Sequence, residues 1–271
     1  MTRKQAPKKV PKKAPERAPV RRQPAAARLD PAELRAFGTR LRAWYKRNAR
    51  DLPWRNTRDP YHILVSELML QQTQVSRVME FYPRFLARFP TLETLAGSRE
   101  THVLAAWEGL GYYARARNLH KLSRAVVREG AAAWGDEPRA RVRLTPTTTA
   151  TTTATLPADP SSLRRLPGIG AYTAGAVASF AFERRAALVD TNVARVITRV
   201  FAPRLQPKRA RDQKPIWAIT EATLPRTGRA TWTHNQALME LGALVCTARV
   251  KRCGRCPVSG ICRSVEPGDE G

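Results

Sequence analysis

Cysteine and acidic residues are both scarce in this chain of 271 residues. There are four cysteines, and 22 Asp and Glu residues stand against 48 Lys and Arg residues, which gives a net charge of +26. No apolar run approaches the roughly 20 residues that a membrane-spanning helix needs. An excess of cations this large indicates a polyanionic partner, and it favours nucleic acid over an acidic membrane surface.

The first 28 residues hold ten Lys and Arg residues and one Glu, so +17 of the net charge belongs to the rest of the chain. They alternate Pro, Ala and cations and offer no apolar surface to bury. We therefore expect residues 1–29 to form a disordered basic tail, and residues 266–271 a short second tail. The first tail lacks the apolar stretch of a secretory signal, although a eukaryotic targeting peptide stays an open alternative. We interpret it as a non-specific DNA-binding arm, since each cation near a phosphate releases a counterion.

The remainder has the composition of a globular domain, with 42% hydrophobic residues and six Trp in the whole chain. Apolar residues recur at helical spacing, and no run alternates as a strand does, so the sequence predicts an all-α fold. The expected helices begin at Pro31 and then cover about 61–72, 74–88, 99–107, 113–129, 162–166, 171–183, 191–202, 213–224 and 232–245. A threonine-rich tract at about 145–160 is expected to be a flexible surface insertion without an apolar face.

All four cysteines lie within seventeen positions, in the pattern C-x6-C-x2-C-x5-C. They are Cys246, Cys253, Cys256 and Cys262. Four sulfur ligands on so short a loop suit either a tetrahedral zinc ion or a cubane iron–sulfur cluster, and two local disulfides are the alternative. The residues between them include four cations and no acid. This loop is therefore a candidate metal site that presents positive charge to phosphate.

Glu67 lies in an otherwise apolar stretch, and apolar residues share its face at helical spacings of three and four. We expect its carboxyl to be buried with a raised pKa, as a general acid requires, whereas a solvent-facing Glu is the alternative. The polar residues 71–73 follow directly, and they carry the amide donors and acceptors that can read base edges.

Two further segments have the chemistry of DNA contact. In residues 166–170, Gly168 and Gly170 precede a helix and can expose backbone N–H groups to a phosphate, as in a helix–hairpin–helix element; a plain helix connector is the alternative. Residues 107–113 place a Leu and two Tyr on a glycine-rich turn, which suits a tip that wedges between bases or, alternatively, a helix end packed in the core. Asp190 precedes another helix, where it is either an N-cap, a carboxylate that faces a developing cation, or both.

In order along the chain, these motifs are LPWR, SELMLQQTQV, WEGLGYYARARNL, LPGIGAYTAG, VDTNVARV and the four-cysteine loop. As a set they resemble the helix–hairpin–helix DNA glycosylases, which are similar to endonuclease III, and within them the MutY family of adenine glycosylases. The resemblance covers roughly residues 30–263. It implies removal of adenine mispaired with 8-oxoguanine or guanine in base excision repair, and a [4Fe–4S] cluster on the four cysteines.

The resemblance also implies roles for individual residues. The catalytic set is Glu67 as the acid that protonates adenine, Asp190 as the carboxylate that stabilises the oxocarbenium sugar, and Tyr172 and Asn192 as their partners. The pocket for the flipped adenine is lined by Arg50, Trp54, Arg55, Leu70 and Gln236. The opposite purine is contacted or wedged by Gln72, Thr73, Leu110 and Tyr112. These roles fit a reaction of two steps. The base is first flipped out of the duplex into a pocket, and two carboxyls then act at the anomeric carbon.

Related enzymes are separated by a few positions. Lyases of the endonuclease III type place a Lys nucleophile where this chain has Tyr172, so the resemblance implies a monofunctional glycosylase. Thymine–guanine mismatch glycosylases share that Tyr, but they have arginines in place of Gln71 and Gln72. Members of the MutY family commonly carry a further C-terminal domain that inspects 8-oxoguanine; nine residues follow Cys262 here, so strictness for 8-oxoguanine is an open expectation.

We therefore predict a two-lobed all-α glycosylase that acts on double-stranded DNA as a monomer, without membrane contact, in the bacterial cytoplasm and associated with the nucleoid. Residues 57–182 are expected to form a helical barrel with the hairpin, and residues 30–56 together with 183–265 the iron–sulfur cluster domain. The alternatives are a thymine or uracil mismatch glycosylase and a non-catalytic DNA-binding module. A binding module has no need of a buried Glu67 together with Asp190.

Overall fold

The computed structural model describes residues 29–130 and 154–265. Within these ranges the chain folds into helices and loops, with one isolated antiparallel bridge between Cys246 and Lys251 and no strand. The all-α prediction is confirmed. None of the helices in these ranges is both long and apolar enough to cross a membrane.

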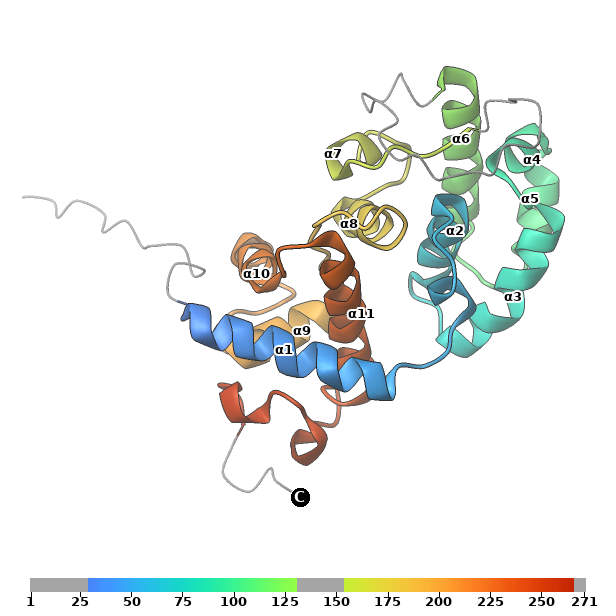
Figure 1. Cartoon of the computed structure of the whole chain (residues 1–271). Helices are drawn as coiled ribbons and strands as arrows, with labels where there is room; N and C mark the ends of the chain where they lie inside the picture. The colour runs from blue at the N-terminus through green and yellow to red at the C-terminus, as the bar shows by residue number, and fades with distance from the viewer. Residues whose placement is uncertain (1–28, 131–153, 266–271) are drawn as a thin grey trace, which may run out of the picture.

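The described helices form two groups, which Figure 1 shows on opposite sides of the molecule. The first group consists of α2 (Pro60–Leu70), α3 (Val75–Arg88), α4 (Leu92–Gly97), α5 (Glu100–Ala106), α6 (Ala114–Glu129), α7 (Pro160–Leu163) and α8 (Ala171–Phe180). Helix α2 lies at its centre and contacts α3, α6 and α8, and eight of its eleven residues are buried. A helix that is apolar on all sides belongs in a core, so α2 can carry a side chain such as Glu67 into the interior.

The second group consists of α1 (Pro31–Asn48), α9 (Thr191–Phe201), α10 (Ala210–Thr223) and α11 (Gly228–Leu244). Helix α11 packs on α1 and α9 and also contacts α8 of the first group, so it joins the two. One cluster of buried apolar side chains runs through both groups. The short helical turns η2 (Pro53–Arg55), η4 (Cys253–Arg255) and η5 (Ser259–Ile261) complete the described elements. The assignment of the second group to an iron–sulfur domain stays a prediction.

Aspartates fix the starts of the two helices that matter most for the pocket described below. The Asp59 side chain accepts hydrogen bonds from the backbone N–H groups of Tyr61 and His62 and so caps α2. The Asp190 side chain accepts one from Val193 N–H, at 2.7 Å, and caps α9. The N-cap interpretation of Asp190 is therefore confirmed, because short acidic side chains satisfy the free N–H groups of a first helical turn.

Several predicted boundaries were wrong. Helix α4 was not predicted, because its six residues are too short for a periodic pattern. Helices α10 and α11 begin at Ala210 and Gly228, three and four residues before the predicted starts. The threonine-rich tract was predicted to lie at the surface as far as residue 160, but residues 156–158 are buried, because Leu156 joins the core. Most of that tract lies outside the described residues, as do both predicted tails apart from Leu29, which packs against the core.

Candidate active site

A central pocket of about 690 Å³ is lined by η2, the C-terminal end of α2, the N-terminal ends of α8 and α9, and one face of α11. Twelve of the residues proposed from the sequence line it: Arg50, Trp54, Arg55, Glu67, Leu70, Gln72, Thr73, Gly170, Tyr172, Asp190, Asn192 and Gln236. Gly168, Leu110 and Tyr112 do not line it. Residues from distant parts of the chain thus meet at one concave site with a few polar groups, the usual form of a ligand site.

Glu67 is buried at the wall of the central pocket, with 2% of its surface exposed. Its carboxylate accepts a hydrogen bond of 2.7 Å from the Tyr172 hydroxyl. Burial raises the pKa of Glu67 to about 7, the Tyr172 hydrogen bond lowers it, and the charge of Asp190 raises it. The expectation of a buried carboxyl with a raised pKa is confirmed. A large fraction of Glu67 is therefore protonated at neutral pH, as a general acid requires.

Asp190 is the second carboxylate at the central pocket. Its two oxygens accept hydrogen bonds from Val193 N–H, at 2.7 Å, and from the Asn192 side-chain amide, at 2.9 Å. Burial raises the pKa of Asp190, while these two hydrogen bonds oppose that rise by stabilising the ionised form. The carboxylate is thus held in one orientation at the start of α9.

Asn192 is itself oriented by Arg195, one turn further along α9. The Arg195 guanidinium donates to Asn192 Oδ1 and to the Gly242 carbonyl, both at 2.7 Å, and its Nε donates to the Cys246 carbonyl at 2.8 Å. A Cβ on Gly242 would lie 2.6 Å from the Asn192 Cβ, so only glycine allows α11 to approach so closely. Arg195 therefore ties the Asp190–Asn192 pair to the cysteine loop.

Sequence reasoning did not single out Glu240, whose side chain has no exposed surface and which also lines the central pocket. Arg50 donates to it from its backbone N–H and from Nε and Nη2, and Arg55 donates from Nη2. Burial would raise the pKa of Glu240, but these hydrogen bonds outweigh burial and lower it to about 2. Arg55 Nε also donates to Gln236 Oε1 at 3.0 Å. An acid inside the apolar run from Ala237 to Leu241 was the signal that could have revealed it.

Arg115 was also missed, and it connects two loops beside the central pocket. Its Nη1 donates to the carbonyls of Leu68, Met69 and Gln71 at the end of α2, and its Nη2 donates to those of Leu110 and Gly111. Its guanidinium also lies over the ring of Tyr112, 5.4 Å from the centroid. Only 7% of Arg115 is exposed. It satisfies carbonyls that would otherwise be unpaired at a helix end, and this fixes residues 71–73 relative to residues 110–112.

The two predicted wedge residues differ in the structure. Leu110 is buried, with 6% exposed, and belongs to the core, whereas Tyr112 is 62% exposed. Tyr112 and Gln72 both have positive φ, +49° and +57°. Such conformations are uncommon for residues with a Cβ, and they concentrate at binding sites where the surroundings enforce them. Tyr112 therefore forms the projecting tip, and Leu110 lies beneath it.

The predicted hairpin element, residues 166–170, lies in the connection 164–170 between α7 and α8. Gly168 has φ +77°, and a Cβ there would meet the Asn118 side chain at 2.6 Å, so the turn requires glycine. Gly170 is the N-cap of α8, and nothing lies within 4 Å of a Cβ built there. The start of α8 is therefore open to an approaching anion.

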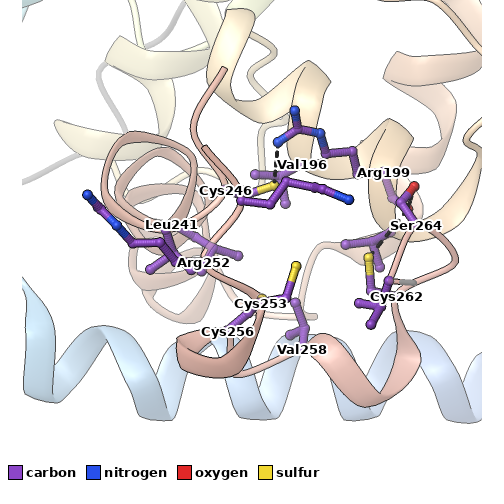
Figure 2. Close-up of a pocket in the computed structure, with 14 residues that line it drawn as sticks. Val196, Arg199, Leu241, Cys246, Arg252, Cys253, Cys256, Val258, Cys262 and Ser264 are labelled. Atoms are coloured by element: carbon purple, nitrogen blue, oxygen red, sulfur yellow. Dashed lines mark hydrogen bonds between the residues drawn. The ribbon is translucent and has the colours of Figure 1, made fainter. Parts of the chain in front are cut away.

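The four cysteines surround one pocket between α9, the end of α11 and the C-terminal turns, as Figure 2 shows. None of these four cysteines forms a disulfide. Arg199 Nη1 lies 3.3 Å from the Cys246 sulfur, and burial raises the pKa of Cys256 to about 11. In the described part of the chain, no three His, Cys, Asp or Glu side chains are close enough together to hold one metal ion. The sulfurs share a pocket without converging on a single point.

This chain is similar to several known proteins. The profile of a family described as "HhH-GPD superfamily base excision DNA repair protein" matches residues 65–219. The adenine DNA glycosylase of Mus musculus is 39% identical over 245 residues, which are 88% of this chain and 43% of that protein. The adenine DNA glycosylase of Mycobacterium tuberculosis (strain CDC 1551 / Oshkosh) is 41% identical over 224 residues, 81% of this chain and 65% of that protein.

A solved structure of a thermostable thymine-DNA glycosylase superposes with a TM-score of 0.71 at 27% identity, and covers 86% of this chain and 96% of its own. The chain spans less than two thirds of the length of the two curated relatives above. The similarity therefore extends over most of this chain and over a part of those proteins.

Proposed function

This chain belongs to the HhH-GPD superfamily of base excision DNA repair proteins, and we propose that it is a monofunctional DNA glycosylase that hydrolyses the N-glycosidic bond of adenine mispaired with 8-oxoguanine or guanine. The observation that carries the proposal is the pair of carboxyls at the central pocket: Glu67, whose pKa is raised to about 7, and Asp190, held by two hydrogen bonds. The curated adenine DNA glycosylases at about 40% identity support adenine as the base.

In this proposal the adenine leaves the duplex and enters the central pocket, since no enzyme reaches the glycosidic bond of a stacked base. Trp54 and Leu70 supply apolar walls, and Arg55 and Gln236 supply hydrogen-bonding groups whose positions Glu240 and Arg50 fix. Duplex DNA contacts the open start of α8 at Gly168 and Gly170, and Tyr112 fills the space beside the opposite base with residues 71–73. The enzyme acts as a monomer.

Bond cleavage needs a proton for the leaving base and negative charge near the sugar. Glu67, protonated in a large fraction of molecules near pH 7, donates its proton to the adenine ring, and Tyr172 holds the carboxyl in place. Asp190 in its ionised form stabilises the positive charge that develops on the sugar, and Asn192 and Val193 N–H keep its oxygens oriented. Water completes the hydrolysis.

The four cysteines are the proposed ligands of a [4Fe–4S] cluster. Their donor set fits such a group, because four thiolates around one shared pocket can each bind a different iron atom, whereas a single zinc ion needs four sulfurs that converge. A bound cluster would hold the loop between Cys246 and Cys262 in shape, so that Arg249 and Arg255 face the phosphates. The protein purified without oxygen should contain iron and inorganic sulfide in equal amounts, and Cys262→Ser should lower both; stoichiometric zinc without sulfide would contradict the assignment.

Single-turnover cleavage of duplexes tests the reaction. Rapid base release is expected with A opposite 8-oxoguanine and with A opposite G, and none with T opposite G. The structural similarity to a thymine-DNA glycosylase makes the last substrate the important control. Release of thymine without release of adenine would replace the proposal with a mismatch thymine glycosylase. Tight duplex binding without release of either base would indicate a non-catalytic module.

A further inference from the structure

A second pocket, of about 620 Å³, adjoins the central one and shares with it the segment from Val189 to Thr191. From that segment this adjoining pocket extends along the first turns of α9 to Ala248 of the cysteine loop, and its outer side is the loop that joins α9 to α10. None of the roles proposed above uses it. Asp190 is thus the boundary between two pockets.

The lining of the adjoining pocket is suited to an anion. Lys208 reaches it from the outer loop, and Thr191 and Arg195 line its inner side. Asp190 is the one acid among the described residues that line it, and Lys208 forms no ion pair within the described parts of the chain. The rest of the lining is mainly apolar, and an exposed ammonium without an ion-pair partner attracts a phosphate with little competition.

The loop that carries Lys208 is held in place by the start of α10. The Gln206 backbone N–H donates to Asp212 Oδ2 at 2.9 Å, and the Gln213 side-chain amide donates to the Pro207 carbonyl. Lys208 therefore directly follows two anchored residues, Gln206 and Pro207, which distinguishes it from a lysine on an unconstrained surface. An ordered base reduces the conformational entropy that the side chain loses on binding.

The path of the DNA strand indicates which ligand the adjoining pocket binds, and this inference rests on the proposed function. If the sugar of the flipped adenine faces Asp190, its strand must leave in two directions. One direction leads to the hairpin, since Gly170 and Ala171 line the central pocket and not the adjoining one. The other leads across Asp190 into the adjoining pocket. We infer that this pocket binds the sugar-phosphate of the nucleotide next to the flipped adenine, on the side away from the hairpin, with Lys208 on its phosphate.

Lys208→Gln tests the inference, with Lys214→Gln as the matched control, because Lys214 is an exposed lysine of α10 outside the pocket. Binding is measured by fluorescence anisotropy with a duplex that carries a 2′-fluoro-adenosine opposite 8-oxoguanine, whose fluorine destabilises the oxocarbenium ion and prevents cleavage. Lys208→Gln should weaken binding by about fivefold near 0.1 M salt and lower the salt slope by about 1, while Lys208→Arg restores both. Equal effects of Lys208→Gln and Lys214→Gln would overturn the inference.

A scan of single neutral methylphosphonates along the adenine strand identifies the phosphate. At one linkage beside the adenine, on the side away from the hairpin, the neutral phosphate and Lys208→Gln should not add, because each removes the same contact. Additive effects at every linkage would refute the site. Wild-type adenine release is recorded in parallel: if adenine is released and the effects add, the inference alone fails, and if no adenine is released the proposed function fails first.

Discussion

Glu67 and Glu240 are two buried carboxyls that line one pocket, each inside an apolar stretch of helix. Burial raises the pKa of Glu67 to about 7, and the hydrogen bond from the neutral Tyr172 hydroxyl offsets this rise only in part. Glu240 is buried as well, but two arginines lower its pKa to about 2. The difference indicates that charged partners can outweigh burial in deciding whether a buried carboxyl carries a proton. Glu67 can therefore carry a proton near neutral pH, whereas Glu240 is held in its ionised form by two arginines.

A Glu67 variant that cannot donate a proton should show the largest effect, a loss of adenine release. Glu67→Gln keeps the volume of the side chain and an oxygen that can accept from Tyr172, but it cannot donate an acidic proton. We expect single-turnover adenine release to fall by about 10³-fold, within the range of about 10²–10⁴ for general acids, while the Kd for duplex DNA changes little. A parallel loss of binding and release would indicate that Glu67 has a structural role and not a catalytic one.

A Glu240 variant without the negative charge should be less stable than the wild type. Glu240→Gln leaves Arg50 and the buried Arg55 without their anion, and we expect a loss of about 3 kcal/mol in the free energy of unfolding at pH 7, or roughly a hundredfold in the folding equilibrium. Glu80→Gln, which removes an exposed carboxylate, should change it by less than about 1 kcal/mol. Urea denaturation of both variants measures the difference.

The pH dependence of that loss checks its cause. Because the folded pKa of Glu240, about 2, lies below the ordinary value near 4.3, its contribution is complete above about pH 4.3 and disappears as the pH falls toward 2. The stability gap between wild type and Glu240→Gln should therefore shrink in acid. A gap that stays constant down to pH 3 would point to packing and not to charge.

The sequence could predict the acid Glu67 and the cap Asp190, because each depends on local pattern: an acid among apolar residues, and an acid just before a helix. It could not predict Arg115, which lies among other cations in the run ARARN and looks like a solvent-facing residue. Its role depends on the packing of α6 against α2, which no local pattern records. Leu156 shows the same limit, since a single apolar residue in a threonine-rich tract gives no periodic signal.

The raised pKa of Glu67 also predicts how the rate of adenine release falls at alkaline pH. The proposed role of Glu67 requires its protonated form, so single-turnover adenine release at saturating enzyme should fall about tenfold per pH unit above about pH 7. At low pH the rate should fall as well, when Asp190 takes up a proton. Rates measured from pH 5 to 9 at constant ionic strength provide the test. A flat profile up to pH 9 would mean that another group supplies the proton.

Tyr172→Phe should produce the smallest change, because it removes only the hydrogen bond that the Tyr172 hydroxyl donates to Glu67. The Tyr172 hydroxyl stabilises the ionised form of Glu67, so its removal should raise the pKa of Glu67 further and move the alkaline limb upward by up to about 1 pH unit. The rate at the plateau should also fall, since the carboxyl is less well oriented. Tyr45→Phe serves as a control, because the Tyr45 hydroxyl has no contact with Glu67 among the hydrogen bonds of the described residues, and its limb should stay in place. If the limb of Tyr172→Phe moved downward, the hydrogen bond would favour the protonated carboxyl instead, and Tyr172 would be a cause of the raised pKa of Glu67 and not an opposing effect.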